Sequence, residues 1–194
     1  MIKTISSLSL ASVFMFSALS AQAAPVKYEF DPTHTYPSFE VDHMGGLSVW
    51  RGKFNKTTGF VTLDEAKKTG QLEAVIDMTS FDSGHDGFNE HAKSADILDV
   101  AKYPKATYKG RLTDFKNGKP TKVIGHLTLK GVTKPVNLEI DDFKCMVNPM
   151  SKAYTCGADV EGEFYRDQFN ADYGKGYGFN MKTKLKIQVE AIRK

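Results

Sequence analysis

The stretch MKTKLKIQVEA, residues 181–191, alternates between apolar side chains and charged or polar ones. Leu185, Ile187 and Val189 fall on one face of an extended chain, whereas Lys184 and Lys186 fall on the other. Because successive side chains of a β-strand point to opposite sides, this period of two indicates a strand with one buried and one solvated face.

The same period recurs along the chain, and turn signals such as Lys130-Gly131 separate the runs. Further strands are predicted at residues 38–44, 50–54, 60–63, 71–79, 105–112, 123–130, 133–140 and 160–164. Short strands at regular spacing with such punctuation favour an antiparallel sandwich or barrel.

Residues 83–102 break this pattern. The segment carries Phe88, Ala92 and Leu98 with few β-branched residues, and Pro104 follows it. We expect one or two short helices there, inserted into an otherwise all-β domain.

The first segment of the chain has the form of a secretory signal peptide. Lys3 precedes an uncharged stretch at residues 5–19, and the motif AQA closes it at residues 21–23. A membrane-spanning helix needs about 18 or more apolar residues, and the uncharged stretch has about 15. A cleaved signal peptide is therefore favoured over a membrane anchor. We expect residues 1–23 to be removed and residues 24–194 to form one domain, in the periplasm or, alternatively, outside the cell. Loss of Lys3 lowers the formal net charge from +3 to +2.

Export decides how the cysteines are interpreted. Cys145 and Cys156 are the only two, and an oxidising compartment favours a disulfide between them. Neither has a histidine within ten residues, and no C-x-x-C motif occurs, so a metal site and redox chemistry are not expected. We predict a disulfide that staples a loop within residues 142–159.

Charge and motifs point away from nucleic acid and catalysis. The 26 basic and 23 acidic residues are mixed, with no basic arm for nucleic acid. No H-E-x-x-H or G-x-S-x-G motif occurs among the five histidines and their neighbours. We therefore expect no metal and no catalytic residue. A secreted hydrolase that uses His85 or His91 with a nearby Ser or Asp is the alternative.

The interior of a barrel of about eight strands is either filled by side chains or open to one ligand. The 13 Phe, 8 Tyr and 1 Trp include several residues on predicted strands. Periodicity alone leaves both interpretations open: a ligand-binding barrel, or a ligand-free interaction barrel with a packed core.

Three ordered blocks carry a resemblance to a known family. The first comprises FDPTHT at residues 30–35 and FEVDHMG at residues 39–45. The second comprises TSFDSGH at residues 79–85 and HAKSADILDVAKYPKAT at residues 91–107, and the third is GHLTLKGVTKPV at residues 125–136. The chain resembles the YceI-like polyisoprenoid-binding proteins across nearly its whole mature length.

This resemblance implies an extended, lipocalin-like antiparallel β-barrel of about eight strands with a helical insert. It implies that the interior holds a long polyisoprenoid, an isoprenoid quinone such as ubiquinone-8 or a polyprenyl phosphate, as carrier or reservoir. Partners would then be the isoprenoid lipid, a membrane contacted transiently, and a second copy of the chain in a homodimer.

The residues expected to line the interior are the inward-alternating ones of the strands and the apolar ones of the insert. They are Phe39, Val41, Trp50, Phe54, Ile76, Leu127, Leu129, Val136, Leu138, Leu185 and Ile187 from strands, and Phe81, Phe88, Ile97 and Leu98 near the mouth. His85 and His91 are the candidates for a hydrogen bond to a quinone carbonyl or a phosphate oxygen.

Overall fold

The computed structural model describes residues 24–194, so the predicted signal peptide at residues 1–23 lies outside the described residues. The strands are β1 (Val26–Phe30), β2 (Tyr36–His43), β3 (Ser48–Phe54), β4 (Thr57–Asp64), β5 (Thr69–Asp77), β6 (Phe81–Asp82), β7 (Lys105–Thr113), β8 (Lys122–Leu129), β9 (Val132–Pro135), β10 (Leu138–Val147), β11 (Tyr154–Tyr165) and β12 (Lys182–Arg193). The helices are η1 (Met78–Ser80), α1 (Asp86–Lys93), η2 (Arg166–Phe169) and η3 (Lys175–Tyr177).

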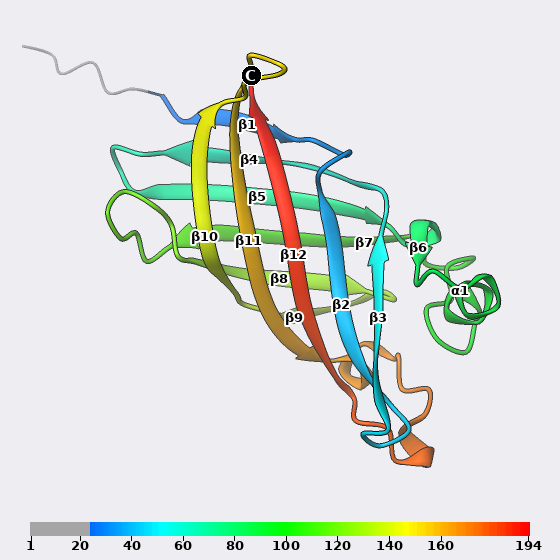
Figure 1. Ribbon diagram of the computed structural model, residues 1–194. Coiled ribbons are helices and arrows are strands. Elements are labelled where there is room, and N and C mark those ends of the chain that lie inside the picture. Colours follow the sequence, from blue (N-terminus) through cyan, green and yellow to red (C-terminus); the bar gives the residue numbers. More distant parts are fainter. Residues whose placement is uncertain (1–23) are drawn as a thin grey trace, which may run out of the picture.

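Eight of these strands close into a barrel because β1 pairs with both β4 and β12. The order around the ring is β1-β4-β5-β7-β8-β10-β11-β12, and all the pairings are antiparallel. β2, β3 and β6 extend the sheet from β12, and β9 pairs with β8. The predicted fold, an antiparallel barrel of about eight strands with a helical insert, is confirmed (Figure 1).

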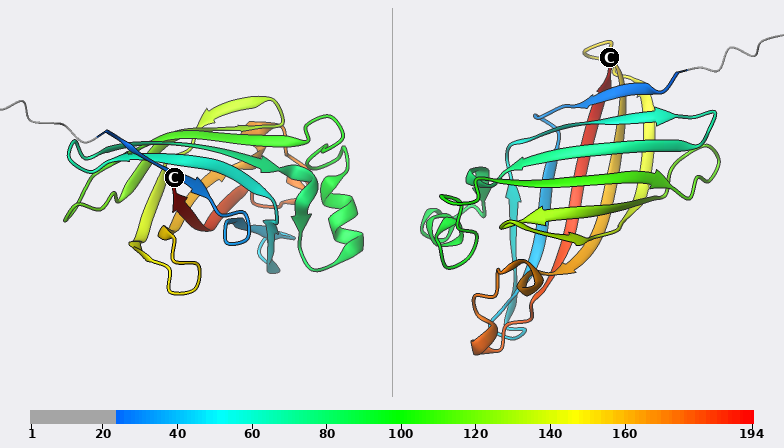
Figure 2. Two further views of the ribbon diagram at one scale, coloured as in Figure 1. Left: turned by 90° about the horizontal axis from the view of Figure 1, so that it is seen from above. Right: turned by 180° about the vertical axis from the view of Figure 1, so that it is seen from behind.

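The barrel has two faces whose strands cross steeply. In Figure 1, β10, β11, β12, β2 and β3 run down one face, while β4, β5, β7 and β8 run across the other. Figure 2 shows α1 at one side of this arrangement, beside β6. The C-terminus lies at the opposite end of β12 from the β2–β3 turn.

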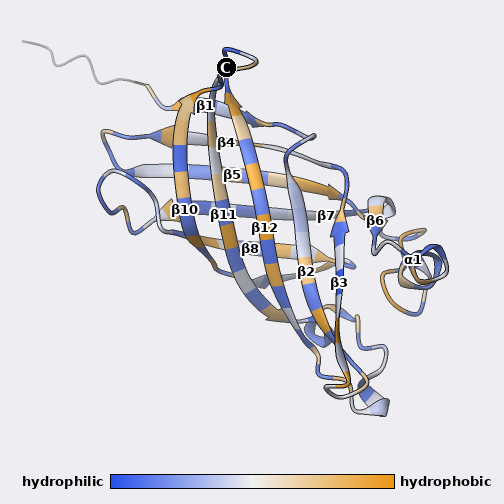
Figure 3. Ribbon diagram, in the orientation of Figure 1, coloured by the Kyte–Doolittle hydropathy of each residue, from blue (hydrophilic) through white to orange (hydrophobic). Residues whose placement is uncertain are grey.

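The period of two holds in β12, which matches the strand predicted at residues 181–191. Leu185 and Ile187 point inward, whereas Lys186 on the outer face pairs with Glu161 of β11 directly across the sheet. The alternation is visible as bands of contrasting hydropathy along β12 in Figure 3. Exposed ion pairs of this kind contribute little to stability, so burial of the inward face holds the strand in register.

The strand predicted at residues 133–140 is interrupted in the structure. β9 ends at Pro135 and β10 begins at Leu138, yet both keep one register against β8. Pro135 has no backbone N–H to donate to the ladder, and the next ladder-like bond runs from Val136 N–H to the Gly125 carbonyl. The inward direction of Val136 and Leu138 survives the interruption.

The cysteines lie in a hairpin rather than in the predicted loop. β10 and β11 continue past Cys145 and Cys156, which are directly opposite one another and joined by a disulfide. A bulge between Ile140 and Asp142 moves the inward face from even to odd residues along β10. Because the bulge shifts the alternation by one residue, strict period-two alternation does not predict the part of β10 that follows Ile140.

The insert contains a single α-helix, and the rest of residues 83–102 forms turns. His85 caps α1, and its Nδ1 accepts a hydrogen bond from the Phe88 N–H at 3.2 Å. The helix stops before Ser94, and Asp99 then adopts a positive φ of 49°. Among the described helices, none is long and apolar enough to cross a membrane.

Candidate functional site

A cavity of about 720 Å³ runs between the two faces of the barrel. Volumes of about 300–1,000 Å³ are typical of pockets that hold an organic ligand. Both Thr183 and Ala191 line it, so it follows β12 for roughly 26 Å at about 3.3 Å per residue.

The structure places every residue predicted for the interior in the wall of this cavity. They are Phe39, Val41, Trp50, Phe54, Ile76, Phe81, Phe88, Ile97, Leu98, Leu127, Leu129, Val136, Leu138, Leu185 and Ile187. The choice between a packed core and an open interior, which periodicity left undecided, is therefore resolved in favour of an open interior. Contact of these side chains with a ligand stays a prediction.

An aromatic cluster forms one part of the wall. The ring centroids of Phe39, Phe54 and Phe81 lie 5.8–5.9 Å from one another. Gly52 makes this packing feasible, because a Cβ at that position would come within 2.8 Å of Phe81 and 2.9 Å of Phe39. Any larger residue at position 52 would therefore clash with the rings of Phe39 and Phe81.

A second aromatic group joins the strands to α1. His43 stacks on Trp50 with ring centroids 5.2 Å apart, and Phe88 of α1 meets Trp50 edge to face. The ring of Phe179 packs edge-on against His43 at 5.7 Å. The helix, the β2–β3 hairpin and the segment before β12 therefore meet at one end of the cavity.

Sequence reasoning missed several wall residues, of which Tyr108 of β7 is the most informative. Its hydroxyl donates a 2.8 Å hydrogen bond to the Val136 carbonyl, and burial raises the pKa of the Tyr108 phenol. A Cβ on Gly125 would come within 2.4 Å of that hydroxyl oxygen, so the glycine provides the room for it. The alternation of Ala106 and Tyr108 on β7 could have identified this residue.

Few polar side chains reach the cavity. The Thr57 hydroxyl is buried in the wall without a hydrogen-bond partner among the described residues. Arg166 of η2 is half-buried in the same wall, and its Nη1 donates to the Ala171 carbonyl at 2.6 Å. Burial lowers the pKa of Arg166, and Asp167, Asp172 and Asp42 oppose that change. The wall is thus predominantly apolar with a few isolated polar side chains, among them the carboxylate of Asp42.

The two histidines proposed for a head group are placed differently. His91 lies in the wall and packs edge-on against Tyr173, with ring centroids 4.9 Å apart. His85 is exposed and does not line the cavity, because its Nδ1 is used in capping α1. Of the two, only His91 is positioned to reach a ligand in the cavity.

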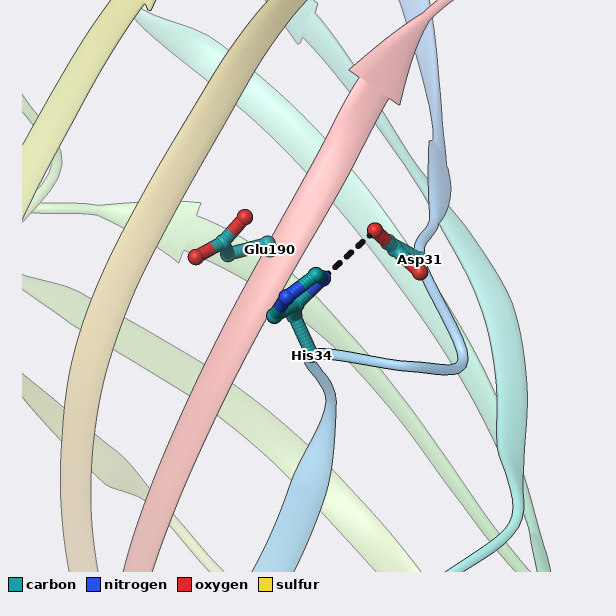
Figure 4. A group of neighbouring side chains, drawn as sticks. All are labelled: Asp31, His34 and Glu190. Atoms are coloured by element: carbon teal, nitrogen blue, oxygen red, sulfur yellow. Dashed lines mark hydrogen bonds and ion pairs between the residues drawn. The ribbon is translucent and has the colours of Figure 1, made fainter. Parts of the chain in front are cut away.

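A separate polar group lies outside the cavity, where β1 leads into β2 (Figure 4). Asp31, His34 and Glu190 offer side-chain atoms within 4.8 Å of one another. The His34 Nδ1 lies 2.8 Å from Asp31 Oδ2, while Thr33 donates to Asp31 Oδ1 through its N–H and its hydroxyl.

The hydrogen bonds within this group set the ionisation of its carboxylate and its imidazole. Although burial acts to raise it, the hydrogen bonds from Thr33 and His34 hold the pKa of the Asp31 carboxyl below its ordinary value. The hydrogen bond to Asp31 raises the pKa of His34. The pair fixes the β1–β2 connection beside Glu190 of β12.

The chain is similar to known proteins over nearly its whole length. The sequence-family model that describes the YceI-like domain matches residues 28–191 of this chain. Protein YceI of Escherichia coli O6:H1 is 34% identical over 192 residues, covering 98% of either chain. A UPF0312 protein of Yersinia pestis (strain Pestoides F) is 33% identical over 192 residues, covering 98% of this chain and 97% of that protein.

Solved structures share the fold at lower identity. A YceI protein of Campylobacter jejuni aligns with a TM-score of 0.64 and 21% identity, covering 76% of this chain and 87% of that one. A polyisoprenoid-binding domain from Saccharophagus degradans aligns with a TM-score of 0.60 and 15% identity, covering 86% and 98%. At these identities the likeness concerns the barrel and its helix.

Proposed function

The chain belongs to the YceI-like family, and from this premise we propose that it is an exported binding protein that holds one polyisoprenoid lipid in its barrel as carrier or reservoir. The observation that carries the proposal is the continuous, predominantly apolar cavity of about 720 Å³. The structural neighbour from Saccharophagus degradans, described as a polyisoprenoid-binding domain, supports the same class of ligand.

The energetics of an isoprenoid tail fit a carrier. At about 0.8 kcal/mol for each buried methylene, a tail of about forty carbons would nominally contribute more than about 25 kcal/mol against water. This exceeds the practical limit of affinity near 20 kcal/mol, because ordering a flexible tail is costly. The competing environment is a bilayer as apolar as the cavity, so exchange between the two is close to balanced.

The polar side chains of the cavity wall indicate which lipid head group the cavity would accept. Arg166 and His91 offer N–H donors, which suit a ligand oxygen that accepts hydrogen bonds. Asp42, Asp167 and Asp172 lie near enough to Arg166 to influence its ionisation, and their negative charge opposes a multiply charged anion. We therefore favour the carbonyl oxygens of an isoprenoid quinone over a polyprenyl phosphate.

The wall gives little support to a hydrolytic enzyme. Within residues 24–194, the cavity lining contains no serine, and Cys156 is held in a disulfide. Its hydroxyl groups belong to Thr35, Thr57, Thr183 and tyrosines. We propose a binding protein without catalytic residues.

Trp50 provides the test, because it is the only tryptophan and lies in the cavity wall. Titration with a ubiquinone that carries two isoprene units should quench Trp50 fluorescence and saturate at one equivalent. Farnesol and farnesyl phosphate, added as competitors, should restore the fluorescence, and the alcohol should compete at least as well as the phosphate. Absence of saturable quenching would count against an isoprenoid ligand, and strong preference for the phosphate would overturn the quinone assignment.

A further inference from the structure

Exposed apolar side chains lie on the β2–β3 turn and around η3, and both segments also contribute residues to the cavity wall. Leu47 is 76% exposed, Met44 57% and Tyr177 79%. Residues 44–50 include no charged side chain. We call the surface formed by Met44, Leu47, Val49, Tyr173 and Tyr177 the apolar tip; Figure 1 shows the β2–β3 turn beside the segment between β11 and β12.

The two loops of the apolar tip are joined by direct contacts. The Asp42 carboxylate accepts hydrogen bonds from the Gly45 N–H at 3.0 Å and from the Asn180 N–H at 2.9 Å. A Cβ on Gly45, whose φ is +67°, would lie 3.2 Å from the Gly178 carbonyl oxygen. The tip is therefore a single surface built from segments far apart in the sequence.

This surface is continuous with the cavity. Met44, Tyr173 and Tyr177 are exposed at the tip and also line the cavity wall. Exposed apolar residues at the far end of β10 and β11, including Met150 at 92%, do not line the cavity. Among residues 24–194, the large exposed apolar side chains that also line the cavity all lie at the tip.

The charges near the tip are locally balanced. Arg51 pairs with Glu40 at 2.8 Å and Lys175 with Asp167 at 2.8 Å, so these cations already have partners. Contact through this surface would rest on burial of apolar groups, with little electrostatic steering. Tyrosine, apolar in its ring and polar at its hydroxyl, suits the boundary between water and hydrocarbon.

We propose that the apolar tip docks onto a lipid bilayer, so that an isoprenoid passes between membrane and cavity without crossing water. A bilayer fits the surface because the same residues continue into a cavity for lipid and because the cations beside it are already paired. The proposal rests on the proposed function, since it names the donor and acceptor surface for that ligand.

Vesicle flotation tests the proposal with full-length mature protein. Wild type should float with phosphatidylcholine vesicles, and added phosphatidylglycerol or salt should change the bound fraction little. Leu47→Asp should lower the partition coefficient about tenfold or more, the ratio expected when one leucine side chain loses its burial. Leu47 does not line the cavity, so the variant keeps the binding wall intact.

Met150→Asp is the matched control, because it introduces the same charge at an exposed apolar residue remote from the cavity. It should float like wild type. Failure of wild type to float, equal flotation of Leu47→Asp, or an equal loss in Met150→Asp would overturn the proposal. A dimer in analytical ultracentrifugation that Leu47→Asp dissociates, without flotation of wild type, would assign the tip to self-association instead.

The two proposals fail separately in this design. Binding of the two-isoprene ubiquinone by wild type and Leu47→Asp, measured by Trp50 quenching without vesicles, reports on the cavity alone. Normal quenching without flotation contradicts the docking surface only. Flotation without quenching contradicts the isoprenoid ligand only.

Discussion

At the residue scale, the hydrogen bond from Tyr108 to Val136 is expected to stabilise the cavity wall. Tyr108→Phe removes the hydroxyl that donates to the Val136 carbonyl and leaves that buried acceptor unpaired. We expect the free energy of unfolding to fall by about 1–3 kcal/mol. Urea denaturation followed by circular dichroism measures it; a change below the error of the method would show that the bond does not stabilise the wall.

The pair formed by Asp31 and His34 should make stability depend on pH. The raised pKa of His34 contributes stability that is present below its ordinary value of 6.5 and is lost as pH rises through the raised value. The lowered pKa of Asp31 contributes stability that is present above 3.8 and is lost as pH falls through the lowered value. Both contributions are present between about pH 4 and pH 6.

An NMR titration of the His34 imidazole checks this. Asp31→Asn should bring the pKa of His34 down toward its ordinary value of 6.5. An unchanged His34 titration in Asp31→Asn would show that the hydrogen bond does not set the pKa.

Residue roles were predictable where alternation alone decides them. Inward residues such as Leu185 and Phe39 follow from the period of two, so the wall could be identified in advance. The function of His85 could not, because a side chain becomes a helix cap only once the backbone has placed it before α1. Gly52 and Gly125 likewise acquire their roles from rings on other strands.

At the scale of elements, Lys130 holds the insert against the segment after β11. This buried residue in the β8–β9 turn donates from its Nζ to the carbonyls of Ile97 and Asn170, both at 2.7 Å. Lys130→Met keeps the aliphatic stem and leaves both acceptors without this donor. We expect a loss of about 1–3 kcal/mol and faster amide hydrogen exchange around Ile97 and Asn170.

Hydrogen exchange followed by mass spectrometry distinguishes a local effect of the two Lys130 hydrogen bonds from destabilisation of the whole domain. Lys134→Met on exposed β9 is the control and should leave exchange at both segments unchanged. If Lys130→Met exchanges like wild type in these segments, the two hydrogen bonds do not tie them together.

The disulfide should stabilise the hairpin of β10 and β11. In the chain-entropy model, a cross-link that closes a loop of this length contributes about 3 kcal/mol. We expect a reductant to lower the melting temperature by several degrees, and the double variant Cys145→Ser, Cys156→Ala to melt at that lower temperature with or without reductant. Equal melting of oxidised and reduced wild type would contradict a stabilising role.

Elements were predictable as far as the alternation stayed in phase. β12, β8 and β5 were recognised because no bulge interrupts them, whereas the outer half of β10 was hidden by the bulge beyond Ile140. Two-residue β6 carries too few residues for a period to show, whereas β1 alternates between apolar and charged side chains and could have been recognised. Their pairing partners lie far away in the sequence, so tertiary structure defines their pairing.

At the scale of the whole molecule, an open interior predicts an unusual response to a larger side chain. Leu127→Trp adds volume to a wall residue of β8. Because the cavity can receive the indole, we expect the free energy of unfolding to change by less than about 1 kcal/mol, against about 1–3 kcal/mol for overpacking a filled core. The lipid content of the purified protein should fall in the same variant.

Ile124→Trp is the control, since Ile124 is exposed on the outer face of the same strand. It should keep both stability and lipid content. Strong destabilisation by Leu127→Trp with unchanged lipid content would indicate a packed interior.

The closure of the barrel marks the limit of sequence reasoning at this scale. Eight strands were expected from the family resemblance, but their circular order depends on β1 pairing with both β4 and β12. That pairing joins Tyr28 to Arg193 across nearly the whole chain, and no local pattern announces it. The volume of the cavity follows from closure and was equally beyond prediction.

A native mass spectrum of the intact mature protein, purified without detergent, would show whether the barrel holds one isoprenoid lipid. We expect the mass of the chain plus one ligand, and release of that ligand into organic solvent should yield an isoprenoid lipid in one-to-one ratio. Protein that is empty after purification from several bacterial hosts, or that carries an unrelated molecule of equal stoichiometry, would show that the barrel does not bind an isoprenoid.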